Sequence, residues 1–190
     1  MPLRWTNSPG RYGALATLLH WTVFLLVLNQ YVAAVLMTSI GRNEQVLGLT
    51  QGNLYNWHKS IGLSALAVVL VRYTWRKATA LPDWAPGLAP WERTLAHAVE
   101  RVLYGCLFLT AVTGFVFVMA GGYGVAFLGL WPLPNPIGEH RLLAWISQLT
   151  HAATAYALVG ALGLHLGLVL KHQWVDRDGL LDRMLPFSRR

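Results

Sequence analysis

Four histidines lie in long apolar stretches of this 190-residue chain, where ionisable side chains are scarce: His20, His58, His151 and His165. His151 and His165 are fourteen residues apart in a run, 142–170, that contains no acidic or basic residue. An α-helix with 3.6 residues per turn brings both imidazoles to nearly the same face, about 21 Å apart along its axis. The apolar core of a bilayer is about 30 Å thick, so the two side chains are expected near opposite leaflets. Ionisable residues inside a membrane span indicate function, and two on one face favour two stacked cofactors.

The depth in the membrane expected for each histidine pairs the two histidines of the long run with one from each of two other apolar stretches. His20 follows the last N-terminal arginine by nine residues, and His165 precedes the next lysine by six, so both are expected at the same depth. His58 opens its apolar stretch, and His151 lies early in the last one, so these two are expected together near the opposite surface. The two pairs would share one helix.

Paired imidazoles suit haem iron, zinc or copper. Zinc and copper sites usually recruit a third or fourth ligand, and the apolar stretches contain no acid and no suitably spaced methionine. Two histidines from facing helices, with room for a flat apolar disc between them, are typical of a b-type haem. Small residues near the histidines would supply that room, namely Gly62, Ser64, Ala152, Ala153, Ala155, Ala157, Gly160, Gly163 and Gly167.

A purely structural role for these residues is the alternative. Each histidine could instead satisfy a backbone carbonyl group, and small residues also serve ordinary helix packing in membranes. Burying four imidazoles without a ligand costs free energy at every position, which favours the cofactor interpretation.

Basic residues near the histidines are candidates for binding haem propionates. Arg72 is fourteen residues after His58, and therefore lies on the same helix face at the depth of the other pair. Arginine binds carboxylates in a bidentate manner, and Arg76 follows one turn later. Lys59, next to His58, is the candidate at the opposite surface. Alternatively, these side chains extend to the membrane surface and only set the topology.

The three remaining histidines have weaker assignments. His172 is seven residues after His165 on the same face, where it could bind a propionate or a quinone carbonyl group. His97 precedes Glu100 and is expected at the inner surface, and His140 is expected in a solvated loop.

The composition defines the elements that would position these residues. Hydrophobic residues make up 55% of the chain and charged residues 12%, about half the usual fraction in soluble proteins. The single cysteine, Cys106, excludes an internal disulfide and a four-cysteine iron–sulfur cluster. We therefore predict an all-α, four-helix transmembrane bundle that forms one domain over residues 1–190, with spans at roughly 15–40, 54–75, 94–120 and 142–174.

The positions of the basic residues orient this bundle. Twelve of the fifteen lysines and arginines, Arg189 and Arg190 included, fall on the side of both termini, and the other side holds Arg42, Lys59 and Arg141. The positive-inside rule predicts a multi-pass membrane protein with both termini in the cytoplasm. The net charge of +7 follows from this topology and does not indicate nucleic-acid binding.

The chain resembles the bacterial cytochrome b561 family over nearly its whole length. The resemblance is carried by Leu19-His20-Trp21, Trp57-His58-Lys59, His151 with His165, and the loop Phe127-Leu128-Gly129-Leu130 followed by Pro132 and Pro134. It implies two haem b groups, held by His20 with His165 and by His58 with His151, and electron transfer with a quinone.

The layout is most similar to that of the membrane superoxide oxidases of this family, which implies transfer from superoxide to ubiquinone. In that relative the histidine that matches His172 lies near the quinone site. Such proteins can carry a second histidine one turn after the position of His97, at the inner surface. This chain has Glu100 there, so the resemblance does not assign an inner-surface site to His97. A superoxide donor would have to meet Arg42, Lys59 and Arg141, the cations of the outer surface.

Two other functions stay open. In the first, the chain is the cytochrome b subunit of a larger oxidoreductase and exchanges electrons with a hydrogenase-like or cytochrome c partner in the periplasm and with quinone. In the second, it is a haem-free transporter, which the lack of a carboxylate within the apolar runs disfavours.

Overall fold

The computed structural model describes residues 4–85 and 87–185 and contains four long helices. Arg189 and Arg190, counted above among the inner cations, lie outside the described residues. The helices are α1 (Ala14–Ser39), α2 (Gln51–Ala78), α3 (Pro90–Ala120) and α4 (Arg141–Lys171), and α4 continues into a π-helical turn η1 (His172–Asp176) and a short 3₁₀ helix η2 (Leu181–Arg183).

Local capping groups explain where the helices begin. Thr50 and Asn53 form a reciprocal capping pair at the start of α2, and Pro90 occupies the first position of α3. At the start of α4, His140 Nδ1 accepts a hydrogen bond from the backbone N–H of Leu143. The caps precede the predicted spans, and α2 and α3 therefore begin three or four residues earlier than predicted.

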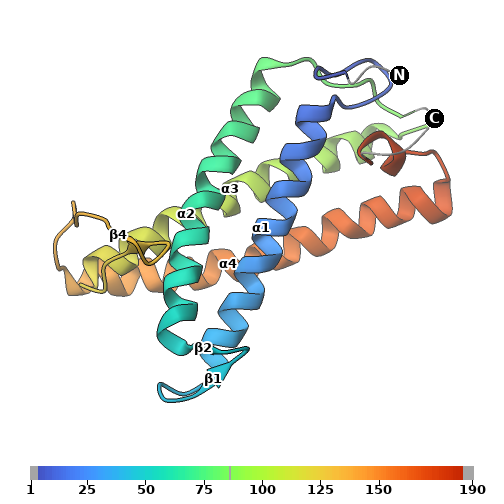
Figure 1. Cartoon of the computed structure of the whole chain (residues 1–190). Coiled ribbons are helices and arrows are strands. Elements are labelled where there is room, and N and C mark those ends of the chain that lie inside the picture. The colour runs from blue at the N-terminus through green and yellow to red at the C-terminus, as the bar shows by residue number, and fades with distance from the viewer. Residues whose placement is uncertain (1–3, 86, 186–190) are drawn as a thin grey trace.

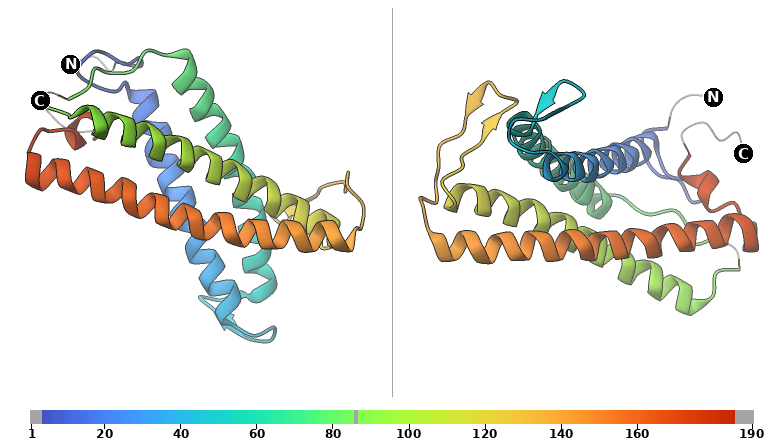
Figure 2. Two further views of the ribbon diagram at one scale, coloured as in Figure 1. Left: turned by 180° about the vertical axis from the view of Figure 1, so that it is seen from behind. Right: turned by 90° about the horizontal axis from the view of Figure 1, so that it is seen from below.

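The helices form two hairpins that cross each other (Figures 1 and 2). α1 packs mainly against α2, and α3 mainly against α4, while α2 and α3 join the two hairpins. The chain segments before α1 and after η1 lie at one end of the molecule, close to the α2–α3 connection (Figure 1). This arrangement is the predicted helical bundle.

Each of the two other connections contains a small antiparallel β-hairpin. β1 (Gln45–Val46) pairs with β2 (Leu49–Thr50), and β3 (Ala126–Phe127) with β4 (Trp131–Pro132). A Leu-Gly pair with positive φ turns the chain in both, at Leu47-Gly48 and at Leu128-Gly129. Turns of this kind require left-handed backbone conformations, which explains the glycines. The sequence analysis predicted loops here and did not anticipate the strands.

The outer surface of the helices is apolar. Leu25, Leu109 and Val159 are among many large apolar side chains that are exposed on α1, α3 and α4. Those three helices, with η1 included in the last, are long and apolar enough to cross a membrane. α2 is not in this group, because polar residues such as Lys59 and Arg72 interrupt its apolar stretch. An apolar exterior over helices of this length is suited to lipid, and the protein is a membrane protein.

Candidate functional site

The structure brings the four histidines together in two pairs. The ring centres of His20 on α1 and His165 on α4 are 6.3 Å apart, and those of His58 on α2 and His151 on α4 are 6.2 Å apart. These are the pairs expected from the membrane depth of each histidine. Each pair joins the α1–α2 hairpin to the α3–α4 hairpin, and α4 contributes one histidine to both.

The separation within each pair fits a shared metal. With metal–nitrogen bonds of about 2.0–2.1 Å on both sides, two imidazole ring centres lie about 6.3 Å apart. The ring planes are inclined by 52° in the first pair and 83° in the second. Rings bound to one metal are free to differ in this angle, so the angles do not conflict with the separation expected for a shared metal.

His151 has the surroundings of a metal ligand. Its Nδ1 lies 2.7 Å from the carbonyl oxygen of Thr110 on α3, and a carbonyl can only accept, so Nδ1 carries the proton and Nε2 is free. Ligating histidines usually donate their second N–H in this way. A Cβ atom at Gly114 would lie 2.8 Å from two atoms of the ring, so only glycine leaves space for this orientation.

Two polar side chains of α2 lie at or near the level of the His20–His165 pair. An Arg72 nitrogen donates to His20 Nδ1 at 2.8 Å, and the guanidinium lies 5.7 Å from the centre of the Tyr104 ring. Trp75, three residues further along α2, has a buried indole N–H with no partner in the described part of the chain. Buried donors are normally satisfied, so this N–H fits an acceptor from outside the protein, such as a propionate or a quinone carbonyl.

The other two propionate candidates already have protein partners. Arg76 forms a bidentate ion pair with Glu100, with distances of 2.8 and 3.0 Å. Lys59 Nζ donates to the carbonyl oxygen of Gly124 at 2.9 Å. Arg72 also has a protein partner, His20 Nδ1, so these contacts favour a role toward haem for none of the three residues.

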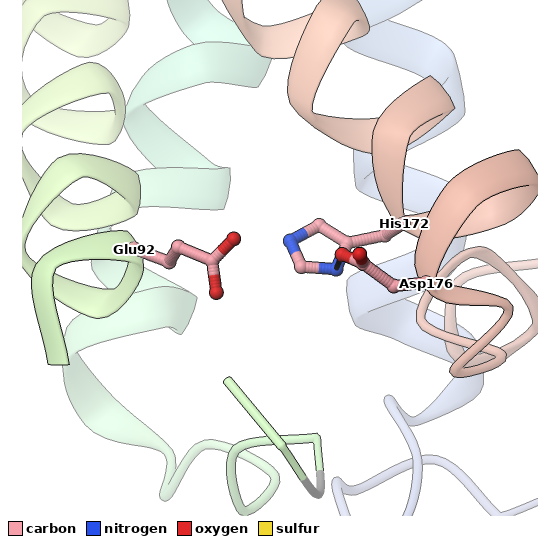
Figure 3. A group of neighbouring side chains, drawn as sticks. All are labelled: Glu92, His172 and Asp176. Carbon is pink, nitrogen blue, oxygen red and sulfur yellow. Dashed lines mark ion pairs between the residues drawn. The ribbon is translucent and has the colours of Figure 1, made fainter. Parts of the chain in front are cut away.

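His172 lies in a cluster of charged residues, with Glu92 and Asp176 beside it (Figure 3). The residue is only 4% exposed, and its Nδ1 lies 2.8 Å from Asp178 Oδ2 and 3.0 Å from Asp176 Oδ2. Figure 3 shows the other edge of the ring turned toward Glu92 on α3. The π-helical turn η1 begins at this residue, and such turns are frequent at functional sites.

Lys171 explains how the acidic groups of this cluster are balanced. Its ammonium binds Glu92 Oε1 and Asp176 Oδ2, each at 2.6 Å. Glu92, His172 and Asp176 offer ligand atoms within 4.8 Å of one another, the spacing of a metal site. Because the lysine already supplies the positive charge between the two carboxylates, we assign no metal to this cluster.

The last two histidines lie apart from the pairs. His97 Nδ1 is 3.7 Å from Glu100, and its ring packs edge-on against Trp84. His140 caps α4 and borders a cleft of about 510 Å³ between the end of α3 and the start of α4. None of the four paired histidines lines this cleft. Both positions agree with the surface roles expected for these residues.

Sequence reasoning missed several residues that contact the site. The carbonyl of Thr110 and the bare backbone of Gly114 leave no signal in a list of chemically active side chains. Gln30 also contacts His58, as described below, and stands in the polar triplet 29–31 of an otherwise apolar stretch. That triplet was the one signal that could have revealed it.

These paired histidines in a membrane-spanning bundle define a class of protein, the haem-binding electron carriers of membranes. The chain matches the family described as prokaryotic cytochrome b561 over residues 11–187, and it belongs to that family. It is therefore a b-type cytochrome of the membrane that takes part in electron transfer.

Three relatives align along nearly their whole length. Cytochrome b561 homolog 2 of Escherichia coli (strain K12) is 26% identical over 98% of this chain and 97% of its own. A probable superoxide oxidase CybB of Yersinia pestis is 25% identical over 94% of this chain and 98% of its own. Cytochrome b562 of Cereibacter sphaeroides is 29% identical over 95% of this chain and 98% of its own.

Proposed function

We propose that this chain binds two haem b groups and transfers electrons between a donor at the outer face and ubiquinone near the inner face. The observation that carries this proposal is the pair of facing histidine couples, each with ring centres 6.2–6.3 Å apart. His20 with His165 would hold the inner haem, and His58 with His151 the outer one. The whole chain, 1–190, acts as one domain of the bacterial inner membrane, with both termini in the cytoplasm.

The bound haems would supply one-electron oxidation and reduction, and the protein supplies position and charge. Thr110 fixes the ring of His151 through its carbonyl oxygen. Arg72 and the indole N–H of Trp75 would bind a propionate of the inner haem. Bis-histidine ligation occupies both axial positions of an iron, which favours electron transfer over oxygen binding.

Superoxide is the outer donor that we propose. The support is the relative named a probable superoxide oxidase, together with the outer cations Arg42, Lys59 and Arg141. Positive charges near an entry point raise the association rate of an anion. A periplasmic protein donor, with this chain as the cytochrome b subunit of a larger oxidoreductase, is the second candidate, because the named relatives include cytochromes with no stated oxidase activity.

At the inner face, we propose that His172 binds the quinone headgroup. Its Nδ1 is held by Asp178 and Asp176, and the other edge of the ring faces Glu92, so a quinone carbonyl oxygen would have to bind Nε2 beside that carboxylate. A histidine between carboxylates also provides a proton route from the cytoplasm, and reduction of a quinone consumes protons. This placement rests on the buried ring and on its distance along α4 from His165.

A haem count tests the central proposal. Purified protein is expected to contain two haem b per chain in a pyridine haemochrome assay. His151→Ala should remove the outer haem and retain the inner one, and His165→Ala should do the reverse. Loss of both haems together from either variant, in protein that remains folded, would contradict two separate sites.

The donor is tested by superoxide-driven reduction of ubiquinone in vesicles. The rate should fall as salt rises, because the reach of the outer charges shortens to about 10 Å at 0.1 M. Lys59→Gln should lower the rate further, and His172→Ala should slow quinone reduction while both haems are still reduced. If superoxide reduces neither haem and a periplasmic protein does, the subunit function replaces the oxidase function.

A further inference from the structure

Gln30 of α1 lies against the outer ligand candidate His58 of α2. One terminal atom of its amide is 2.9 Å from His58 Nδ1 and 3.2 Å from the His58 carbonyl oxygen, and the other is 3.1 Å from the backbone nitrogen of Gly62. The amide therefore contacts the imidazole and also the helical hydrogen-bonding groups beneath it. Such a three-point contact fixes the position of the amide relative to the ring.

The neighbours of Gln30 fix the backbone that carries it. Asn29 accepts a hydrogen bond from Trp57 Nε1 on α2 at 3.0 Å, and the hydroxyl of Tyr31 donates to the carbonyl oxygen of Ala155 on α4 at 2.6 Å. These three consecutive polar residues of α1 thus bond to both helices that carry the outer histidines. The inner ligand candidate of α1 is ten residues away, so this triplet serves the outer pair.

An amide can present either a donor or an acceptor to the same atom, because turning it by 180° exchanges its oxygen and nitrogen. With the nitrogen toward His58, all three contacts are hydrogen bonds, and Nδ1 is an acceptor. A histidine that binds iron through Nε2 carries its proton on Nδ1, and then the amide oxygen must face the ring. In that orientation the amide gives up its hydrogen bonds to the His58 carbonyl oxygen and to the Gly62 N–H. Haem binding and the orientation of this amide are therefore coupled.

We propose that Gln30 is the positioning residue of the outer haem: its amide oxygen accepts the Nδ1 proton of ligated His58 and thereby tunes the outer haem's potential. This inference rests on the proposed function. A stronger acceptor at this point makes the imidazole a better electron donor to iron, which stabilises the oxidised form. A missing acceptor has the opposite effect. The potential should therefore move in opposite directions in two variants of one residue.

The experiment compares Gln30→Glu and Gln30→Leu with the wild type by redox titration of the whole protein. Gln30→Glu should lower the midpoint potential of the outer haem, and Gln30→Leu should raise it. A tenfold change in the ratio of reduced to oxidised haem corresponds to about 59 mV for a one-electron couple, and we expect shifts of this order. The inner haem should keep its potential in both variants.

Thr38→Val is the control, because it removes a side-chain hydrogen bond of α1, that of the Thr38 hydroxyl to the Ala34 carbonyl oxygen, without touching His58 or the neighbours of Gln30. It should leave both potentials unchanged. If either Gln30 variant loads poorly, Gln30→Met keeps the length of the side chain without its amide and should raise the outer potential as Gln30→Leu does. Two haems with an unaltered outer potential in all Gln30 variants would overturn the inference and leave the haem sites intact. A wild type without haem would instead overturn the proposed function.

Discussion

Glycine 114 shows how far a single residue can control the outer site. The absence of a side chain at Gly114 leaves space for the His151 ring. At Gly105, on the same helix, an added Cβ atom would meet no atom within 4 Å. The two glycines therefore form a matched pair in which the helix is the same and only the neighbour differs. Replacing either with alanine raises helix propensity by about 1 kcal/mol, so that effect cancels in the comparison.

Gly114→Ala is expected to weaken retention of the outer haem, while Gly105→Ala leaves it unchanged. Overpacking costs about 1–3 kcal/mol, which corresponds to roughly 5- to 150-fold weaker binding. Haem content after dialysis against a haem-binding competitor measures this loss. Equal retention in the two variants would show that the ring has room to shift, and would remove the proposed role of Gly114.

Arg72 offers a test at the inner site. If its positive charge neutralises a propionate, Arg72→Gln should lower the potential of the inner haem, because lost positive charge disfavours the reduced form. The outer haem should hardly change. Arg76→Gln is the control, since Arg76 is bound to Glu100, and it should shift the inner potential much less. Equal shifts in both variants would mean that only the overall field of the arginines matters.

The chemically active residues of the site were predictable from the sequence, and their supports were not. Histidines in an apolar stretch stand out because burying them costs free energy. The spacing of fourteen residues between His58 and Arg72 places both on one face of a helix. The contacts of Gln30, Thr110 and Gly114 depend on how neighbouring helices meet. The spacing of residues within one helix does not show which residues of two helices will meet.

At the scale of elements, the inner ends of α3 and α4 are joined by charge. Glu92 near the start of α3 is 6% exposed and accepts a bond from Lys171 at the end of α4. Helix α3 is thereby anchored at its N-terminus, although it supplies no histidine to either pair. The helices were predictable from the length of the apolar stretches, but this ion pair was not, because its members are 79 residues apart in sequence and lie outside those stretches.

Lys171→Met should lower the melting temperature, because it leaves the carboxylate of Glu92 without its cation. The double variant Lys171→Met with Glu92→Gln should recover most of the loss, since the buried side chain at position 92 is then neutral. Thermal unfolding in detergent, followed by tryptophan fluorescence, measures both. A double variant as unstable as the single one would show that the lysine acts through Asp176 instead.

For the whole molecule, one end is closed by segments distant in sequence. The backbone N–H of Tyr12 donates to the carbonyl oxygen of Arg183, the indole of Trp21 to that of Met184, and the backbone N–H of Asp83 to that of Pro9. The chain before α1, the α2–α3 connection and the segment after η1 therefore meet on one face. Burial of Tyr12 in this assembly raises the pKa of its hydroxyl, which stays protonated at neutral pH.

The orientation of this face can be measured with single cysteines in a Cys106→Ser background. We expect Asn43→Cys, in the α1–α2 connection, to react with a membrane-impermeant maleimide in intact spheroplasts. Thr6→Cys should react only after the membrane is permeabilised, because the closed face is predicted to lie in the cytoplasm. The reverse pattern of labelling would invert the topology, and with it the assignment of inner and outer haems.

The crossing of the two hairpins has a consequence for biogenesis. Each hairpin is held by contacts within itself, while direct contact between hairpins is mostly that of α2 with α3. Both histidine pairs span this junction, so each haem would hold the two hairpins together. Fragments 1–84 and 87–190, produced together, are expected to co-purify when haem synthesis is active and to separate when it is blocked. The supply of haem would then decide whether newly made chains mature or are degraded.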